Sequence, residues 1–347
     1  MRVDVSSDTA TEPSAEMRDA MATARAKPRS SSDNEVGRLQ ALGADLLGKE
    51  AGLYMPTGTQ ANLVAILSHT APSQEVLLGQ DSHIYEQEVG GAAALAGVML
   101  RTWPEGGVPT PTELTEAIDP AHRFPTSAAP EPALLCLENS HNASGGRVIH
   151  VEEMIELCSI ARRRFPAVHL DGARIFNAAA AAGVSAHRLA DPVDSVSISL
   201  DKGLSAPMGA LLMGSSEFIV RATRWRRMLG GYMRKAEIMA AAGVVALERM
   251  VGQLELDNRR AARIGEHLVS VGLGVQPYPV QTNLLMLDTH EFGIEPQSFV
   301  DRLDEDYGIL AHVYGRRLVR LAIHRHVRDD EEEAIVAGVT ELAHQRS

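Results

Sequence analysis

The stretch SVSISLDKGLSAPMGALLMG, residues 195–214, predicts two buried strands joined by a tight corner. Serine alternates with Val, Ile and Leu over residues 195–200, which is the period of a strand with two unlike faces. The pattern stops at Lys202, and an apolar stretch resumes over residues 209–213. Because the link is too short for a helical crossover, we expect the two strands to be antiparallel neighbours. The position of a lysine at this corner requires an explanation.

Short apolar segments alternate with helix-length segments through the first two thirds of the chain. The predicted strands cover residues 52–55, 75–79, 98–102, 133–138, 168–171, 194–200 and 209–213. Helical patterns such as 59–68 and 151–164 lie between them. This alternation predicts an α/β fold with a mostly parallel seven-stranded sheet and helices on both faces.

A second αβ segment follows a long helical region that runs from residue 213 to about residue 251. Strand patterns recur near 283–287 and 318–323, each followed by a helical pattern. We therefore expect a large domain over residues 1–250, with an N-terminal arm, and a small C-terminal αβ domain over 251–347.

Composition excludes several classes of protein. The chain of 347 residues is 45% hydrophobic and carries a net charge of −12, so it lacks the basic surface of a nucleic-acid or anionic-membrane binder. Its two cysteines, Cys136 and Cys158, fit no metal or redox spacing, which favours a reducing compartment. There is no apolar run long enough to span a membrane and no signal-peptide pattern. We expect a cytoplasmic protein without a metal site.

Polar or Gly-rich segments follow five of the predicted strands. In open α/β sheets, ligands bind beyond the carboxyl ends of the strands, so these segments predict one shared site. In chain order they read PTGTQAN, QDSHIYEQEVGG, ENSHNASGG, DGARIFN and LDKG.

Three of these segments carry groups that suit a phosphorylated cofactor. TGTQAN (57–62) places a glycine and hydroxyls where a helix begins, which predicts either an anion cradle or an ordinary helix cap. Asp171 ends an apolar strand and needs a cationic partner, either a protonated heterocycle or Arg174 in a structural salt bridge. Lys202 would have a lowered pKa if its amine pointed into the crevice, or would be an exposed turn lysine otherwise. Together they match pyridoxal 5'-phosphate, which needs a phosphate cradle, an Asp and a Lys.

Eight blocks, in order along nearly the whole chain, resemble the low-specificity L-threonine aldolases. These are fold-type-I pyridoxal-phosphate enzymes of the β-eliminating-lyase group. The blocks are SSDTATEPSAEMRDAM, GKEAGLYMPTGTQANLVAILSH, GGAAALAGV, LENSHN, HLDGARIFNA, DKGLSAPMGALLMGS, RWRRMLGGYMR and VRLAIHRHV.

The resemblance implies roles around the cofactor. Lys202 is similar to the lysine that binds the cofactor aldehyde, and Asp171 to the partner of the pyridinium nitrogen. His83 resembles the imidazole stacked on the ring, although a capped loop histidine is the alternative. Gly58 and Thr59 match the phosphate loop.

The resemblance also implies how the substrate is held. Ser7, Arg174 and Arg320 resemble the groups that bind the substrate carboxylate, where two guanidiniums would give a bidentate clamp. His141 resembles the histidine near the β-hydroxyl. His324 and His326 are interpreted as structural.

Assembly follows from the same resemblance. Arg234 matches an arginine that reaches the active site of a neighbouring subunit. The segments GGAAALAGV (90–98) and MLGGYM (228–233) are small and apolar enough for close contact between subunits. We therefore expect a homodimer or homotetramer with shared active sites.

Three positions depart from the family pattern. Ser6 replaces an arginine, and Asp201 stands where a serine usually precedes the lysine. The loop 26–36, AKPRSSSDNEV, replaces an acidic, Tyr-containing loop and has Ser30 near the position of the tyrosine. If this loop faces the site, its Lys, Arg and Ser side chains favour a substrate with an anionic or polar β-substituent. If it faces solvent, the change is neutral.

The reaction implied by the resemblance is retro-aldol cleavage of a β-hydroxy-α-amino acid, such as L-threonine or L-allo-threonine, to glycine and an aldehyde. The altered loop favours an alternative within the same cofactor class, namely β-elimination or racemisation of a different amino acid. A scaffold that keeps the fold without catalysis is the alternative from another class.

Overall fold

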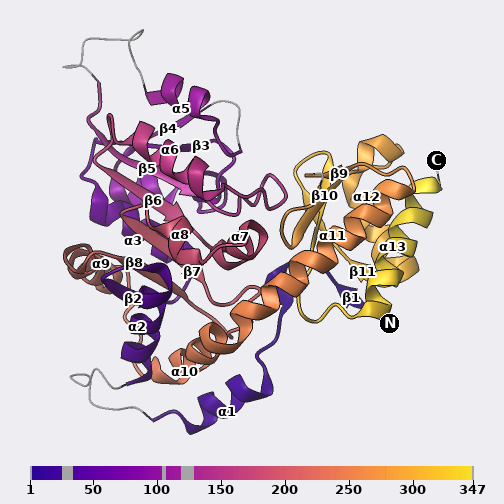
Figure 1. Ribbon diagram of the computed structural model, residues 1–347, viewed down its shortest axis with the longest axis horizontal. Helices are drawn as coiled ribbons and strands as arrows, with labels where there is room; N and C mark the ends of the chain where they lie inside the picture. Colours follow the sequence, from indigo (N-terminus) through magenta and orange to yellow (C-terminus); the bar gives the residue numbers. More distant parts are fainter. Residues whose placement is uncertain (1, 26–33, 104–106, 119–128, 278, 346–347) are drawn as a thin grey trace.

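The computed structural model describes residues 2–25, 34–103, 107–118, 129–277 and 279–345. The chain forms two lobes, and the helix α11 (Leu254–Ser270) runs from the larger lobe into the smaller one (Figure 1). Among the helices in these ranges, none has both the length and the hydropathy needed to cross a bilayer.

The larger lobe is built on a seven-stranded sheet with the order β2-β8-β7-β6-β5-β3-β4. Six of the seven strands run in the same direction, whereas β8, which lies between β2 and β7, is antiparallel to both. This confirms the predicted sheet and the antiparallel pair at residues 195–214. The strands are β2 (Ala51–Met55), β3 (Glu75–Gly79), β4 (Met99–Trp103), β5 (Pro132–Glu138), β6 (Ala167–Asp171), β7 (Ser195–Ser199) and β8 (Ala210–Gly214).

Helices cover the sheet. The sequence predicts one long helical region after residue 213, but the structure has two main helices there, α9 and α10. A turn containing Gly230 at φ +76° separates them, a backbone conformation that glycine adopts without strain. The helices of this lobe are α1 (Ala15–Thr23), α2 (Glu35–Leu47), α3 (Gly58–His69), α4 (His83–Glu86), α5 (Pro111–Ile118), α6 (Val151–Ala161), α7 (Ile175–Ala182), α8 (Ala186–Ala190), α9 (Ser216–Met228) and α10 (Glu237–Val245).

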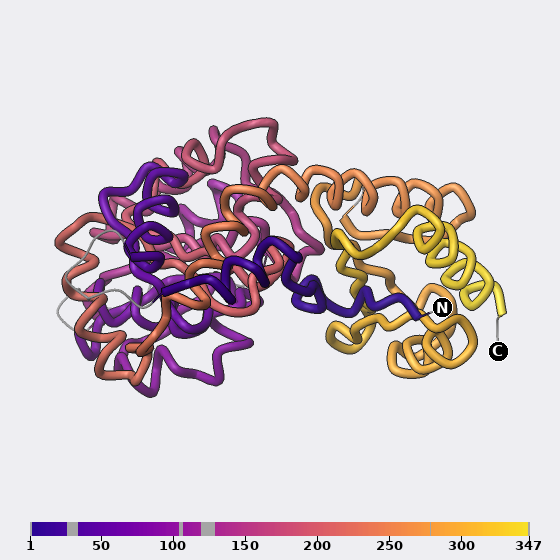
Figure 2. The backbone as a smooth tube through the Cα atoms, turned by 90° about the horizontal axis from the view of Figure 1, so that it is seen from below, coloured from indigo at the N-terminus to yellow at the C-terminus, as the bar shows by residue number. Residues whose placement is uncertain are grey.

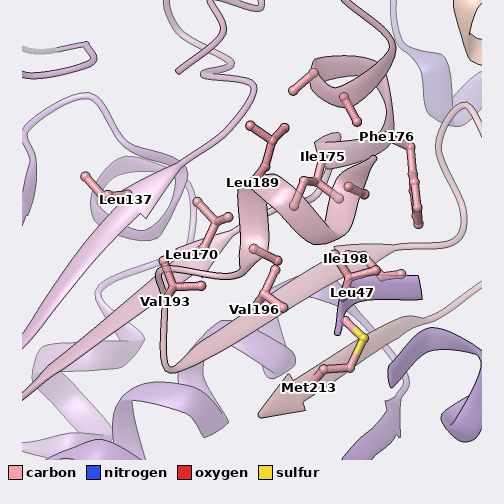
Figure 3. Packing of buried hydrophobic residues seen from close by; sticks show 14 of the residues in the cluster. Leu47, Leu137, Leu170, Ile175, Phe176, Leu189, Val193, Val196, Ile198 and Met213 are labelled. Atoms are coloured by element: carbon pink, nitrogen blue, oxygen red, sulfur yellow. The ribbon is translucent and has the colours of Figure 1, made fainter. Parts of the chain in front are cut away.

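The apolar residues of β7 face the main hydrophobic core. Figure 3 shows Val196 and Ile198 beside Leu170 of β6 and against Ile175 and Leu189 of α7 and α8. All five side chains are buried, and burying a residue of this size stabilises the fold by about 1.5–3 kcal/mol.

The serines of β7 face the opposite side, along the length of α3. Ser197 Oγ donates to Asn62 Oδ1 at 2.7 Å, and Ser195 Oγ lies 2.8 Å from His69 Nε2 at the end of the helix. Ser199 Oγ lies 3.3 Å from the point where a Cβ on the first residue of α3 would sit. The alternation seen in the sequence therefore separates an apolar core from a polar seam beneath α3.

The smaller lobe has its own core around a four-stranded antiparallel sheet with the order β12-β13-β10-β9. Helices α11, α12 and α13 pack on it, and predicted strands near 283–287 and 318–323 correspond to β10 and β13. The elements are α12 (Pro296–Tyr307), α13 (Asp329–His344), β9 (Val275–Gln276), β10 (Leu284–Asp288), β12 (His312–Tyr314) and β13 (Leu318–Ala322).

The N-terminal arm begins in the smaller lobe. Strand β1 (Val3–Asp4) pairs in parallel with β11 (Ile309–Leu310), and Val5 is fully buried in the same core. The arm then crosses to the larger lobe, where α1 packs on α10 (Figure 2). The sequence analysis had assigned the whole arm to the large domain, and the domain division near residue 250 stays a prediction.

Candidate active site

The carboxyl ends of the parallel strands bring the predicted cofactor residues together. Asp171 is the last residue of β6, Lys202 lies in the corner after β7, and His83 begins α4 after β3. One ligand-capable atom from each of His83, Glu88 and Asp171 lies within 4.8 Å of the other two. The site thus forms at the sheet edge that the sequence predicted.

Asp171 is a buried carboxylate with partners on both oxygens. Oδ2 accepts from Asn62 Nδ2 at 2.8 Å, and Oδ1 accepts from the backbone N–H of Ala173 at 3.0 Å. Burial alone would raise the pKa of Asp171, but the charges of His83 and Lys202 and these hydrogen bonds hold it below its usual value. Asp171 is therefore an ionised acceptor, as a partner of a pyridinium must be.

His83 is held from two sides. Its backbone N–H donates to Glu138 Oε2 at 2.8 Å, and its Nδ1 lies 3.0 Å from Glu88 Oε1. Burial would lower the pKa of His83, but the hydrogen bond to Glu88 and the charge of Asp171 raise it. These contacts fix the ring plane, which a stacking imidazole requires.

Lys202 is half-buried at the corner of the β7–β8 hairpin. Burial lowers the pKa of its amine, and the nearby charge of Arg174 acts in the same direction. An amine with a lowered pKa is the nucleophile that bond formation with an aldehyde needs. The exposed-turn interpretation does not hold for this lysine.

The corner that carries Lys202 is fastened to the N-terminal arm and to the smaller lobe. The Lys202 carbonyl accepts from Thr11 Oγ1 at 2.7 Å and from the Ser205 N–H at 2.8 Å. Ser205 Oγ accepts from Arg325 Nε at 3.0 Å, and Arg325 Nη2 also donates to Glu12 O at 2.7 Å. Both lobes therefore determine where the lysine sits.

Gly58 and Thr59 form the first turn of α3, as predicted. Thr57 caps the helix by accepting from the Gln60 N–H at 3.1 Å, so the N–H groups of the two residues between them face outward. Little space separates Gly58 from β7, because a Cβ there would lie 3.3 Å from Ser199 Oγ. Such a turn suits a phosphate.

Arg174 pairs with Asp8 rather than with Asp171, the partner that the salt-bridge interpretation suggested. Its Nε and Nη2 donate to the two carboxylate oxygens at 2.6 and 2.8 Å, and Asp8 is fully buried. Burial would raise the pKa of Asp8, but Arg174 holds it well below the usual range. The two guanidinium nitrogens expected to clamp a substrate are thus bonded to Asp8. The third nitrogen, Nη1, is left for the site.

Arg320 lies beside Arg174, and the two share one acceptor. Asn142 Oδ1 accepts from Arg320 Nη1 at 3.0 Å and from Arg174 Nη1 at 3.2 Å. Arg320 Nε is buried and has no hydrogen-bond partner among the described residues. Burial, helped by the charge of Arg174, lowers the pKa of Arg320 to about 10. An oxygen between two guanidiniums marks a carboxylate position.

The two N-terminal serines lie next to this pair of arginines. Ser6 O accepts from Arg320 Nη2 at 3.0 Å, while Ser6 Oγ donates to Asp4 Oδ1 at 2.6 Å. Ser7 Oγ lies 2.8 Å from Thr9 Oγ1 and is partly exposed. Ser6 therefore supplies a backbone carbonyl to the site, and its side chain turns away toward Asp4.

His141 is buried with one free ring nitrogen. Nδ1 lies 2.9 Å from Ser144 Oγ, whereas Nε2 has no hydrogen-bond partner in the described part of the chain. The nearest carboxylate oxygen, Asp81 Oδ1, is 3.6 Å from Nε2. His141 directly precedes Asn142 in the chain, so the same segment carries both residues, and a buried ring nitrogen without a partner suits a proton acceptor.

The remaining predicted residues lie outside this cluster. Arg234 is exposed in the turn between α9 and α10 of the single chain. His324 and His326 are structural, since their Nε2 atoms bond to Asp4 O at 2.8 Å and to the Glu12 N–H at 3.0 Å. Most of the altered loop, residues 26–33 with Ser30, lies outside the described residues.

Several residues of the site were missed by the sequence analysis. Asp8, Asn62 and Asn142 all lie inside the quoted blocks, yet none was given a role. Asn62 had a usable signal, because it follows Gly58 by one helical turn and so shares its face. Arg325 had none, because Ser205 is distant in the sequence, and Glu88 had none, because nothing in the segment 80–91 indicates that its carboxylate turns back to His83 and toward Asn62.

These side chains fit pyridoxal 5'-phosphate by their chemistry. Asp171 would accept from the ring nitrogen, Lys202 would bind the aldehyde, and the turn at Gly58 would hold the phosphate. A buried carboxylate whose existing partners are both donors has room for a further N–H.

Comparison with known proteins places the sequence among lyases. The family model described as "Beta-eliminating lyase" matches residues 4–291. The chain is 37% identical over 352 residues to the probable low-specificity L-threonine aldolase 2 of Arabidopsis thaliana, covering 99% of this chain and 97% of the relative. It is 40% identical over 294 residues to the low specificity L-threonine aldolase of Escherichia coli K12, covering 83% and 85%.

The fold is shared with a solved threonine aldolase from Leishmania major. The two chains superpose with a TM-score of 0.81 at 18% identity, over 98% of this chain and 99% of that one. At this identity the likeness establishes the fold alone, with its two lobes and mostly parallel sheet.

Proposed function

The chain belongs to the β-eliminating lyase family of fold-type-I pyridoxal-phosphate enzymes, and on that premise we propose that it cleaves a β-hydroxy-α-amino acid of the L-threonine or L-allo-threonine type to glycine and an aldehyde. The observation that supports this proposal most directly is the buried Nε2 of His141, which has no hydrogen-bond partner among the described residues and belongs to the residue before Asn142, the shared acceptor of the two arginines. Cleavage of the Cα–Cβ bond requires a base that removes the β-hydroxyl proton, and His141 is our candidate for that base.

The substrate carboxylate replaces Asn142 Oδ1 as the acceptor of Arg320 and Arg174. Arg320 supplies Nη1 and the unpartnered Nε, and Arg174 supplies Nη1. Two guanidiniums fix the carboxylate in a plane and so select which bond at Cα is broken. His141 Nε2 then removes the β-hydroxyl proton.

Bound pyridoxal phosphate supplies an aldehyde for amines and an electron-accepting ring. Lys202 would hold the aldehyde, and its lowered pKa would favour exchange with the substrate amine. Asp171, as a carboxylate, would accept a hydrogen bond from the ring nitrogen and so keep it protonated. His83, held by Glu88 and Glu138, would be the residue to stack on the ring.

Product analysis tests the reaction. Purified protein with pyridoxal 5'-phosphate is incubated with L-threonine, L-allo-threonine and L-serine, and glycine, aldehyde, pyruvate, ammonia and D-amino acids are quantified. We expect glycine and acetaldehyde in equal amounts from a threonine. Pyruvate and ammonia would instead identify β-elimination, D-amino acids a racemase, and no product with any substrate a silent scaffold.

We further propose a homodimer or homotetramer with shared active sites, located in the cytoplasm. Val89, Leu95 and Met99 are 98%, 58% and 53% exposed, and Met228 at the end of α9 is 73% exposed. Large apolar side chains exposed in this way are candidates for contacts between subunits. The cytoplasmic location is supported by the two cysteines, which are free and buried.

Hybrid oligomers test the shared site. If Arg234 acts in the site of a neighbouring subunit, Arg234→Ala and Lys202→Ala are each inactive alone, but hybrids formed from the two contain intact sites. We expect activity to return when the two variants are unfolded and refolded together. Inactive hybrids, or an active monomer in sedimentation at low concentration, would contradict the proposal.

A further inference from the structure

Asn62 lies at the centre of a buried hydrogen-bond network behind Asp171. Its Nδ2 donates to Asp171 Oδ2 at 2.8 Å and to Glu88 Oε1 at 2.8 Å. Its Oδ1 accepts from Ser197 Oγ at 2.7 Å and from His169 Nε2 at 3.1 Å. A side-chain amide has two donor hydrogens and two acceptor lone pairs, so this buried residue is fully satisfied.

The chemistry of the partners determines the orientation of the amide. Asp171 already accepts from a backbone N–H and is ionised, so the NH₂ group must face it. The amide oxygen then faces His169, and because an amide oxygen only accepts, His169 Nε2 must carry a hydrogen. Burial lowers the pKa of His169 to about 4, so at neutral pH its Nδ1 has none.

The same reasoning places the protons further along the network. His169 Nδ1 lies 2.9 Å from Ser195 Oγ and accepts from that hydroxyl. Ser195 Oγ in turn lies 2.8 Å from His69 Nε2, which must donate because the hydroxyl hydrogen is already used. His69 is also uncharged at neutral pH, since burial lowers its pKa to about 3. All donors therefore point from His69 toward Asp171.

Glu88 explains why this direction matters. Its carboxyl group is buried, and burial raises its pKa, so it is a possible proton donor close to Asp171. Two carboxyl groups in direct contact share a proton, which would leave Asp171 uncharged. The NH₂ group of Asn62 bonds to one oxygen of each and so occupies the position of a direct contact between them.

We propose that Asn62 is a positioning residue that keeps Asp171 a pure hydrogen-bond acceptor for the cofactor ring nitrogen, and that the chain His69–Ser195–His169 prevents its amide from turning over. The assignment of the ring nitrogen rests on the cofactor of the family. The proton positions rest on the hydrogen-bond geometry, together with the lowered pKa values of the two buried histidines, and do not depend on which substrate is cleaved.

NMR of the cofactor-free wild-type protein tests the proton positions. Two-bond ¹H–¹⁵N spectra of ring-labelled histidines distinguish the two neutral forms of each imidazole. We expect His169 and His69 to stay uncharged, with hydrogen on Nε2, from pH 8 down to about pH 5.5, because their pKa values are lowered to about 4 and about 3. Hydrogen on Nδ1 of His169, or protonation in this range, would overturn the proposal.

The positioning role is tested with Asn62→Ala and with Ser68→Ala as a matched control. Ser68 is buried on the same helix, but within the described ranges its hydroxyl bonds only to Val64 O, at 2.6 Å. Measurements are the exchange of the glycine α-hydrogen with D₂O, which does not require an aldol substrate, and the Kd of pyridoxal phosphate by fluorescence.

We expect Asn62→Ala to slow the exchange by about tenfold to a hundredfold, the loss typical of one hydrogen bond to a charged group. The loss of exchange rate should be smaller at higher pH, because the proton that Asp171 and Glu88 would share in this variant is then removed. Ser68→Ala should match the wild type. The positioning role would be overturned if Asn62→Ala exchanged the glycine α-hydrogen as fast as the wild type, or if its loss did not vary with pH. If that variant does not fold, the NMR spectra of the wild type still test the proposal.

Discussion

Arg174 and Asp8 form a two-bonded ion pair in which neither side chain is more than 5% exposed, although 166 residues separate them in the sequence. The pair joins the N-terminal arm to the start of α7. Because Asp8 has this guanidinium as its main counter-charge, the pair has a structural role as well as a place in the site.

Replacing Arg174 with Ala should therefore lower stability as well as activity. Removing one partner of a buried pair leaves an uncompensated charge and costs about 3–5 kcal/mol of the free energy of unfolding. Urea unfolding of Arg174→Ala measures this cost. The control is Arg221→Ala, which removes an exposed ion pair with Glu217, since Arg221 is 44% exposed. Equal midpoints for Arg174→Ala and wild type would show that Asp8 is neutral or finds another partner.

Arg320→Lys should act mainly on substrate binding. An ammonium cannot supply both Nη1 and Nε, so we expect KM for L-threonine to rise by about tenfold or more. The Kd of pyridoxal phosphate and the unfolding midpoint should change little, because Arg320 pairs with no carboxylate among the described residues. Unchanged KM would place the carboxylate site elsewhere.

Lys202→Ala should abolish turnover without unfolding the protein. We expect a loss of about a thousandfold or more, as for removal of a catalytic nucleophile. The visible absorbance band of the bound cofactor and its sensitivity to borohydride should both differ from those of the wild type. Lys49→Ala provides the contrast, because Lys49 Nζ only donates to Ala190 O and Val193 O, at 2.8 and 2.6 Å. It should lower stability and keep turnover.

Arg325→Gln tests whether the smaller lobe positions Lys202. Losing the bond to Ser205 releases the corner that carries the lysine, so we expect kcat to fall by about tenfold with an unchanged Kd for the cofactor phosphate. Arg317→Gln is the control, since Arg317 is 61% exposed in the same lobe and pairs with Asp288. Equal kcat for the two variants would mean that the corner holds its shape alone.

Stability should fall on acidification because of His169. Its pKa is lowered from 6.5 to about 4, so between these values the unfolded chain binds a proton that the folded chain does not. The contribution of His169 to the free energy of unfolding then falls by about 1.4 kcal/mol per pH unit as the pH drops below 6.5, and His69 adds to the same trend. His169→Gln should reduce this slope, whereas His290→Gln, at a ring that is 42% exposed, should not. The same slope in both variants would assign it to other groups.

The seven strands of the large sheet could be predicted because each is either a mainly apolar run or, in β7, an alternation of serine with apolar residues, bounded by polar or Gly-rich segments. The strands β1, β9, β11 and β12 could not, because two or three residues are too few to show a period of two. Likewise, the lysine and aspartate at the strand ends were visible from their positions. The role of Asp8 was not, because a single sequence carries no signal for a partner that the fold alone brings near.

The pairing of β1 with β11 has a consequence for synthesis on the ribosome. Val3 leaves the ribosome long before its partner Ile309, and at about 5–20 residues per second the delay is roughly 15–60 seconds. During that interval β1 has no strand to pair with, so the arm that carries Asp8 toward Arg174 is not yet anchored in the smaller lobe. The anchored arm of the native structure can therefore form only when translation has nearly ended.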